Sequence, residues 1–105
     1  PIEIAIRERV CHPGNSIHIA LTFPSGSESL DGELRVERAL FDAQQKLTGF
    51  AAPASHIIKY SGLTAEKLSL TLEAPALPGV YRLAFYHAGA QELSGSDELF
   101  VQGNG

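Results

Sequence analysis

The sequence lacks residues on which several classes of protein depend. It has no tryptophan, no methionine and a single cysteine, Cys11, among 105 residues. One cysteine excludes an intramolecular disulfide, so cysteine usage does not indicate a redox compartment. No apolar run approaches the roughly 20 residues that a membrane-spanning helix needs, and no signal peptide is visible. We therefore expect no membrane insertion.

Positive charge is also scarce. Asp and Glu together number 12 and Lys and Arg together 8, which gives a formal net charge of -4. The basic residues are scattered along the chain, whereas proteins that bind nucleic acid or anionic membranes present a basic face. The composition therefore argues against both kinds of partner.

The chain does have enough apolar residues for one hydrophobic core. They make up 44% of the sequence, which argues against disorder, and the length fits one domain. The chain starts at Pro1 and closes with Gly-Asn-Gly. We expect one domain over residues 1–102 and a terminal tail over 103–105, cut from a longer protein or produced by processing.

Short apolar runs with a period of two recur between turn segments rich in Pro, Gly and Ser. This alternation is typical of half-buried strands in antiparallel sheets. The run "KLSLTLE" is the strictest example, with Leu68, Leu70 and Leu72 on one face. The strands predicted in this way cover residues 2–7, 15–22, 33–41, 56–60, 66–73, 80–87 and 97–102.

The segment 33–47 allows two interpretations. Val36 and Leu40 fall at helical spacing among good helix formers, whereas Leu34 and Val36 alternate with charged residues, as on a strand. We favour the strand, because a hairpin with its tip at "DAQQK" completes a set of seven. A break in the alternation near Arg38–Ala39 would then require a bulge.

The stretch "LPGVY" carries the clearest signal of the fold. In immunoglobulin-like sandwiches a tyrosine near the start of a late strand bonds back to the backbone across a corner. Here Pro78 and Gly79 set the turn and Tyr81 opens the strand that follows. The stretch resembles the corner of fibronectin type III and related domains. That resemblance implies an all-β fold, a seven-stranded antiparallel immunoglobulin-like β-sandwich with Greek-key topology, in which Tyr81 is a structural clasp.

Other features limit this resemblance to the broad immunoglobulin-like class. The core tryptophan and the disulfide of antibody domains are both missing. The tail "YRLAFYHAGAQELSGSDELFV" is similar to the closing hairpin of SKICH-type and bacterial accessory immunoglobulin-like modules.

In such a topology three loops rich in Ser and Gly meet at one end of the sandwich. These loops carry the acidic residues Glu28, Asp31, Glu92 and Asp97. Loops at this end bind partners in variable domains and in many fibronectin-type modules, so these residues are candidates for a partner site. Calcium coordination by the same oxygens is an alternative, and solvated loops that only keep the end soluble are the simplest interpretation.

Two tyrosines are candidate surface aromatics. Tyr86 faces opposite to Tyr81 and Phe85, which predicts that it lies on an outer sheet face, and Tyr60 precedes a turn. Glycan-binding sandwiches stack sugar rings on exposed aromatic side chains. These two tyrosines make a small platform for that purpose.

No motif points to a metal site or to catalysis. The expected topology allows only Cys11, His12 and His56 to approach one another, and they lack zinc-site spacing. Neither "SGS" is a nucleophile elbow, and the adjacent Asp97 and Glu98 project to opposite sides of a strand. We expect no cofactor, no metal and no enzymatic activity.

The combined pattern favours a non-catalytic accessory module of a larger, extracytoplasmic protein. It would act as a spacer, an inter-domain docking domain or a protein-binding domain, and would be monomeric when isolated. Its partner would be a neighbouring domain of the same chain or another protein, and an exposed apolar patch on one sheet face would mark the docking surface. The alternative is a ligand-binding domain for a glycan or a divalent cation.

Overall fold

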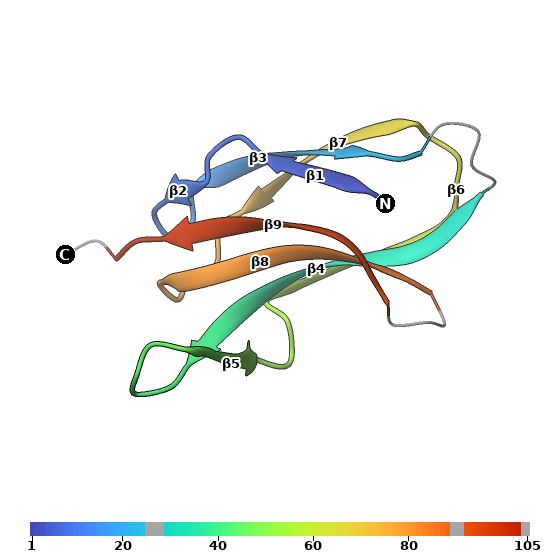
Figure 1. Ribbon diagram of the computed structural model, residues 1–105. Helices are drawn as coiled ribbons and strands as arrows, with labels where there is room; N and C mark the ends of the chain where they lie inside the picture. The colour runs from blue at the N-terminus through green and yellow to red at the C-terminus, as the bar shows by residue number, and fades with distance from the viewer. Residues whose placement is uncertain (25–28, 89–91, 104–105) are drawn as a thin grey trace.

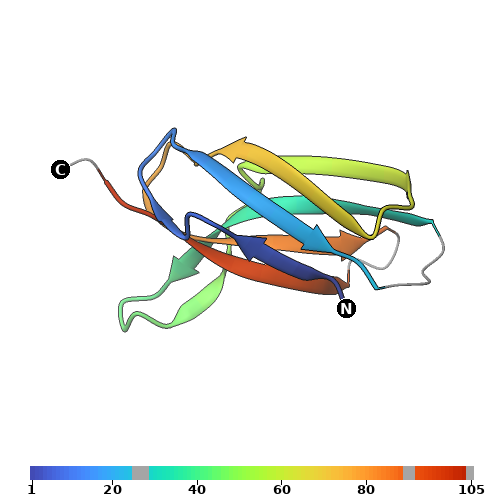
Figure 2. The same ribbon diagram turned by 90° about the horizontal axis from the view of Figure 1, so that it is seen from above.

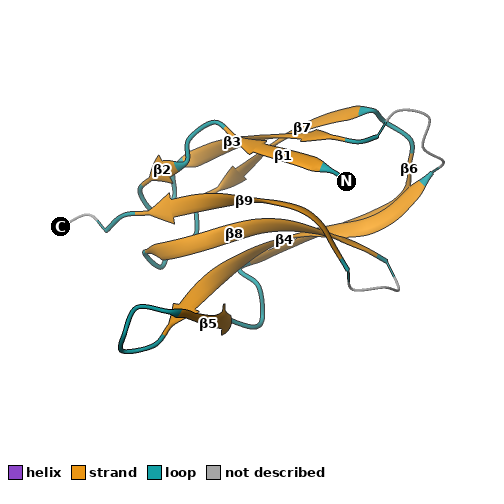
Figure 3. Cartoon of the chain, in the orientation of Figure 1, coloured by secondary structure: helices purple, strands orange, loops and turns teal. Residues whose placement is uncertain are grey.

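The computed structural model describes residues 1–24, 29–88 and 92–103, and within them the chain forms strands and no helix (Figures 1 and 3). The strands are β1 (Glu3–Ile6), β2 (Val10–Cys11), β3 (Ser16–Thr22), β4 (Leu30–Phe41), β5 (Leu47–Phe50), β6 (His56–Leu63), β7 (Lys67–Glu73), β8 (Gly79–His87) and β9 (Leu93–Val101). The all-β class predicted from the sequence is confirmed. The predicted set of seven strands in Greek-key order is not confirmed, because the described part of the chain has nine strands. The hairpin strand expected after "DAQQK" is β5, whereas β2 was not expected.

The strands form two sheets that pack face to face (Figures 1 and 2). One has three strands in the order β1-β3-β7, and the other has the order β2-β9-β8-β4-β5, with β6 also paired to β4. Both β5 and β6 use the same edge of β4: β6 pairs with its first half and β5 with its end. The parallel pair is β2 with β9, and the other pairings between described strands are antiparallel.

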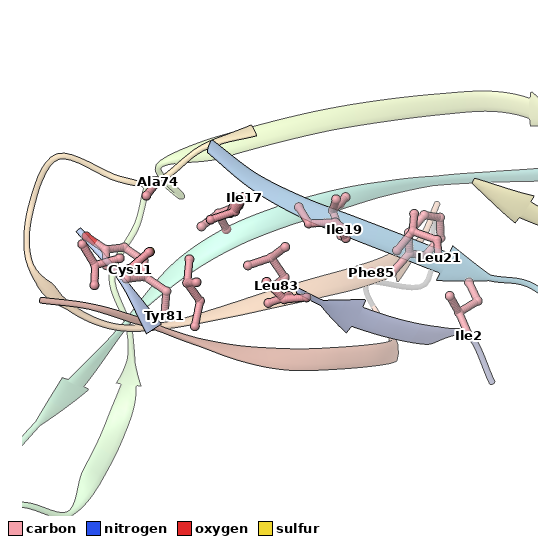
Figure 4. Close-up of a cluster of buried hydrophobic side chains, with 14 of the residues drawn as sticks. Ile2, Cys11, Ile17, Ile19, Leu21, Ala74, Tyr81, Leu83 and Phe85 are labelled. Carbon is pink, nitrogen blue, oxygen red and sulfur yellow. The ribbon is translucent and has the colours of Figure 1, made fainter. Parts of the chain in front are cut away.

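The core lies between the sheets, where inward positions alternate with outward ones. On β3 the inward residues Ile17, Ile19 and Leu21 are almost fully buried, and they face Leu83 and Phe85 on β8 (Figure 4). Each such side chain stabilises the fold by about 1.5–3 kcal/mol through removal of apolar surface from water. The period of two in the sequence is therefore the cause of the layered core.

The segment 33–47 forms a strand and the start of a hairpin, as favoured from the sequence. No register shift falls at Arg38–Ala39, where a bulge was expected; the shifts on β4 lie between Leu40 and Phe41 and between Leu30 and Gly32. Along one edge β4 changes partner, from β6, which pairs as far as Val36, to β5, which pairs from Ala39 onward. The strand therefore continues through the predicted break.

The tyrosine corner joins β7 to β8. The Tyr81 hydroxyl donates a hydrogen bond to the backbone carbonyl of Leu77, and the ring of Tyr81 is buried in the core. Gly79 has a φ of +155°, a conformation that a residue with a Cβ atom rarely adopts. The turn at Pro78 and Gly79 thus places the Tyr81 ring in the core, and the hydrogen bond to Leu77 fixes the ring to the same turn.

Candidate functional site

A groove of about 200 Å³ lies on the outer face of the six-stranded sheet, beside the β4–β5 hairpin. The residues that matter for its chemistry are Ala39, Phe41, Leu47, Phe50, Val80 and Arg82. The hairpin projects beyond the body of the sandwich, on the side away from the three-stranded sheet (Figure 1). The groove is therefore open to a neighbouring molecule.

Turn chemistry holds the hairpin tip in place. The Asp42 carboxylate accepts hydrogen bonds from the backbone N–H groups of Gln44, at 2.9 Å, and Lys46, at 3.0 Å. Gln45 takes a φ of 64°, which the tight turn requires. Asp is favoured at such positions because its side chain bonds to the backbone of the following residues. The sequence "DAQQK" thus forms a defined turn that positions the flanking Phe41 and Leu47.

Among the large apolar side chains exposed on this face, three lie at or beside the groove. Phe41 is 46% exposed, Leu47 54% and Phe100 40%. Phe41 and Leu47 are cross-strand partners in the hairpin, and Phe100 lies opposite Val80 on the neighbouring strand. Exposed apolar side chains that gather on one face, with polar groups around them, mark interaction surfaces.

A polar cluster lies next to the groove on the same sheet face. Its centre is the buried Glu37, whose Oε1 accepts a hydrogen bond of 2.7 Å from the Tyr86 hydroxyl and one of 3.1 Å from the Arg82 guanidinium. The Arg35 guanidinium lies 4.2 Å above the Tyr86 ring. Because a buried carboxylate must be paired, Glu37 holds Arg82 in place.

The position of Arg82 connects the cluster to the groove. Its guanidinium carbon lies 3.6 Å above the centre of the Phe50 ring. Such a cation–π contact with a ring on β5 ties the hairpin to β8. The groove is thus built on side chains whose conformations are held by hydrogen bonds.

The sequence prediction that Tyr86 is a surface aromatic is wrong. The ring does lie on the outer sheet face, as the alternation predicted, but only 8% of the residue is exposed because Arg35 and Arg82 cover it. Burial, followed by the hydrogen bond to Glu37, raises the pKa of the Tyr86 phenol. The sequence does not reveal the cover by Arg35, because that residue comes from β4, far from Tyr86 in the chain.

Tyr60 also differs from the expected surface platform. It is half-buried and stacks against Phe85 in the core, with ring centres 6.2 Å apart and an interplanar angle of 26°. Burial raises the pKa of its phenol. Tyr60 therefore belongs to the edge of the core, because it points toward the opposite sheet from β6.

The predicted loop end is assembled only in part. Ala88 N donates to the Asp31 carbonyl at 3.1 Å and His87 N donates to the Glu92 carbonyl at 3.3 Å, so Asp31 and Glu92 lie at the same end. The Asp31 carboxylate also accepts from Gly62 N at 2.7 Å. Glu28 lies outside the described residues.

Asp97 was wrongly placed in that loop. It lies within β9, which begins at Leu93, earlier than predicted. Its carboxylate accepts a hydrogen bond from Ile6 N at 3.0 Å and forms an ion pair with Arg9. Asp97 therefore fastens the β1–β2 segment to β9, because the strand that carries it runs beside that segment.

A cavity of about 340 Å³ opens between the sheets at the loop end. Its lining mixes apolar residues such as Phe23, Leu30 and Leu63 with polar residues that include Glu66 and His87. Concave sites with this mixture of apolar surface and a few polar groups are typical of small-ligand pockets. The sequence pattern identified this end but not the cavity.

The histidines and the cysteine are dispersed over the fold. Nδ1 of His18 lies 2.5 Å from a carboxylate oxygen of Glu8, and Nδ1 of His12 lies 3.1 Å from the Gln102 carbonyl oxygen. Among the residues that the structure describes, no three of His, Cys, Asp and Glu are grouped as metal ligands. The Cys11 thiol is buried, and burial together with the charge of Glu8 raises its pKa.

In the described part of the chain, no helix is long and apolar enough to cross a membrane.

The chain matches no protein-family model and no curated protein. Among solved structures it is similar to a candidate lipoprotein from Bacillus anthracis, with 16% identity and a TM-score of 0.45, over 95% of this chain and 73% of that one. It is also similar to the CARDB domain of a Pyrococcus furiosus protein in complex with di-metal ions, with 14% identity and a TM-score of 0.46, over 95% of this chain and 89% of that one. At these levels of similarity, function has to be argued from the chain's own surface.

Proposed function

We propose that the chain is a non-catalytic, immunoglobulin-like accessory module of a larger, extracytoplasmic protein. It docks on a neighbouring domain or on another protein through the outer face of its six-stranded sheet. The observation that carries this proposal is the exposure of Phe41, Leu47 and Phe100 around the groove beside the β4–β5 hairpin.

Two features support the finer assignment to the fibronectin type III-like group. The seven predicted strands correspond to β1, β3, β4, β6, β7, β8 and β9, which leaves β2 and β5 as additions to that set. Tyr81 makes the corner hydrogen bond that such sandwiches share. The β5 addition is the element that creates the groove.

The composition of the groove favours a protein partner. Aromatic side chains and arginine are enriched where proteins meet, and binding energy concentrates on a few such residues in well-packed surroundings. Here the Phe50 ring lies against Arg82, which Glu37 already holds in place, and Phe41 lines the same groove. Because little side-chain freedom remains to be lost at Arg82, association costs less conformational entropy there.

The state of Cys11 and His18 supports a module without catalysis. The raised pKa of the buried Cys11 thiol disfavours the thiolate, which is the nucleophilic form. His18 is paired with Glu8 on the three-stranded sheet.

Hydrogen exchange tests the docking face. Amide exchange would be compared between the isolated chain and the longest natural polypeptide that contains it. We expect slower exchange in the longer polypeptide over residues 39–50 and at Val80. A Phe41→Ser/Leu47→Ser variant should lose this protection while keeping its unfolding midpoint, since both side chains are exposed.

Leu77→Ser is the matched control, because Leu77 is similarly exposed, at 55%, but lies in the tyrosine corner. It should leave the protection intact. Equal exchange in the isolated and the longer chains would reject docking through this face.

The cavity at the loop end supports a second candidate function, the binding of a small glycan. The sequence offered a divalent cation as the other ligand, although the described residues group no three metal ligands. Thermal unfolding with calcium, zinc and an oligosaccharide panel tests it, since a ligand that binds only the folded state raises the unfolding temperature. A rise that His87→Ala abolishes would favour this function. No rise with any of these ligands would remove it.

A further inference from the structure

The three-stranded sheet ends at β7, whose outer edge carries no strand among the described residues. β7 pairs with β3 along its whole length. The strand that precedes it in the chain, β6, pairs with β4 in the other sheet instead. Figure 2 shows β6 and β7 along one side of the sandwich and β1 and β9 along the other. The side that β6 and β7 border is therefore an open flank.

Backbone hydrogen bonds beyond both ends of β7 show which groups face this flank. Ala74 N donates to Asn15 O at 2.7 Å, and Phe23 N donates to Glu66 O at 2.8 Å. Because hydrogen-bonded pairs recur every two residues in an antiparallel ladder, the even-numbered residues of β7 bond to β3. The residues that turn their N–H and C=O groups to the open edge are Lys67, Ser69, Thr71 and Glu73.

The central part of the β7 edge, from Leu68 to Leu72, lacks the devices that normally block strand addition. Natural edge strands are blocked by proline, bulges, inward-pointing charges or charged side chains such as lysine, or are covered by other segments. The charges of β7, Lys67 and Glu73, lie only at its two ends. β7 has no proline, and its register with β3 is unbroken from Lys67 to Glu73.

The other end of this sheet is closed. Ile2 N donates to the Ser94 carbonyl of β9 at 3.0 Å, and Ile6 N donates to the Asp97 carboxylate at 3.0 Å. Those contacts satisfy outward-facing N–H groups of the β1 segment. The contrast makes β7 the exposed edge of the three-stranded sheet.

The flank also leaves apolar side chains incompletely covered. Leu68, Leu70 and Leu72 of β7 point inward but are only partly buried, and so are Ile58 and Tyr60 of β6. The inward residues of the central strand β3 are almost fully buried. A strand added beside β7 would cover this apolar margin.

We propose that β7 pairs antiparallel with β7 of a second copy of the chain, about a twofold axis at Leu70. In this register Lys67 lies opposite Glu73 of the partner subunit, and Ser69 lies opposite Thr71 of the partner subunit. All four of these positions turn their backbone groups to the edge, so the opposed residues can exchange hydrogen bonds. The second copy is the preferred occupant because β7 is complementary to itself in charge.

Symmetry sets the register of this contact. Opposite charges directly across an antiparallel pair are stabilising, and like charges are destabilising. The twofold axis repeats the Lys67 pairing with the partner's Glu73, so that both ends of the shared ladder are ion pairs. A slip by two residues would remove these pairs.

The dimer goes beyond the proposed docking function and uses a different surface. The contact extends the three-stranded sheet sideways, whereas the groove lies on the outer face of the six-stranded sheet. Failure of one proposal therefore leaves the other standing. The proposed dimer differs from the monomer that was expected from the sequence.

Sedimentation velocity of the whole chain over a wide range of concentrations tests the dimer. We expect reversible dimerisation of the unaltered protein. Lys67→Glu places two carboxylates opposite each other at both ends of the ladder, and Glu73→Lys does the same with two ammonium groups. Each single variant should weaken dimerisation roughly tenfold or more.

Exchanging the charges of Lys67 and Glu73 gives the decisive test. The double variant K67E/E73K restores opposite charges at both ends and should recover the affinity of the unaltered chain. A mixture of the two single variants should form heterodimers, because one then carries Glu at both positions and the other Lys at both. Dimerisation that both single variants retain would reject the proposed register.

Two further variants test whether the edge of β7, and no other surface, causes dimerisation. Lys59→Glu reverses an exposed charge on β6 and should leave dimerisation unchanged. Thr71→Pro removes an N–H group that faces the open edge, where proline is tolerated; it should abolish the dimer, and far-ultraviolet circular dichroism will show whether it folds. If the unaltered chain stays monomeric at every concentration, the proposal is wrong regardless of how Thr71→Pro folds.

Discussion

The Tyr86 hydroxyl donates a hydrogen bond of 2.7 Å to Oε1 of Glu37, from one strand of the six-stranded sheet to its neighbour. Glu37 is only 9% exposed although it lies on the outer face of that sheet. The carboxylate also receives the Arg82 guanidinium. The outer face of the sheet therefore carries an ordered polar patch beside the groove.

Tyr86→Phe should destabilise the protein by about 1–3 kcal/mol, because a buried carboxylate then loses one of its hydrogen-bond donors. Urea unfolding monitored by circular dichroism measures the change. A cycle with Glu37→Gln isolates the coupling, and we expect an interaction free energy of about 0.5–3 kcal/mol. If the two substitutions were simply additive, the hydrogen bond would not couple these residues.

Tyr81→Phe should cost about 0.5–1.5 kcal/mol, the net value of a typical hydrogen bond, because it removes the hydroxyl that bonds to the Leu77 carbonyl. Tyr81→Ala should cost about 3–5 kcal/mol, since it also leaves a cavity in the core. Both values come from chemical unfolding. An unchanged stability of Tyr81→Phe would show that the corner hydrogen bond does not contribute.

In an alkaline titration, three tyrosines of the folded protein should ionise at higher pH than a solvent-exposed tyrosine. Burial is the largest cause that raises the pKa of Tyr60, Tyr81 and Tyr86 above the ordinary value of 10.0. Folding therefore favours the protonated phenols. Their contribution to stability is complete below the unfolded-state pKa and is lost as the pH rises through the folded-state values.

Ultraviolet difference absorbance measures this effect on the folded protein and on the protein in denaturant. We expect the folded protein to titrate at higher pH and to lose stability above pH 10.0. Superimposable curves would contradict the burial of the three phenols.

Acid should weaken the link between the β1–β2 segment and β3. The Glu8 carboxylate accepts hydrogen bonds from the backbone N–H of His18, at 2.7 Å, and from its ring. The backbone hydrogen bond is the largest cause that holds the pKa of Glu8 below its ordinary value of 4.5. Its contribution is therefore present above pH 4.5 and is lost as the pH falls through the folded-state pKa.

The measurement is the free energy of unfolding against pH for the unaltered chain and for Glu8→Gln. The difference between the two should shrink toward acid. A difference that stays constant across this range would mean that the ionisation of Glu8 does not stabilise the fold.

Gly95→Ala should destabilise the protein by about 1–3 kcal/mol through overpacking. A Cβ atom at Gly95 would lie 1.9 Å from the Ile2 carbonyl oxygen, so the start of the chain would have to move away from β9. Thermal unfolding measures the loss. Ser96→Ala, at the exposed neighbouring position, is the control and should change stability little.

Several elements were predictable because their signals are local. The alternation in "KLSLTLE" identified β7, and the alternation of Leu34 and Val36 with charged residues identified β4 against the helical alternative. The turn at Pro78 and Gly79 indicated where Tyr81 enters the core. In each case, the residues that decide the structure are close together in the chain.

Other features depended on strands that are distant in sequence. The alternation of side chains predicted the face on which Tyr86 lies. Its cover by Arg35 and its hydrogen bond to Glu37 come from β4, far away in the chain. The position of Asp97 was missed because β9 begins earlier than its alternation suggested, and the start of the strand is set by pairing with β8. The exposure of a residue and the ends of a strand therefore depend on neighbouring strands as well as on the local sequence.

The sequence by itself determined that the chain is all-β, which positions alternate into a core, and that a tyrosine corner could form, because these follow from a period of two and from turn chemistry. Only the tertiary structure decided that β6 pairs with β4, leaving β7 as an open edge, and that the β4–β5 hairpin stands beside a groove. Strands with the same alternation are equivalent as far as local patterning is concerned. Their partners are chosen by long-range hydrogen bonding and packing between segments that meet only in the folded chain.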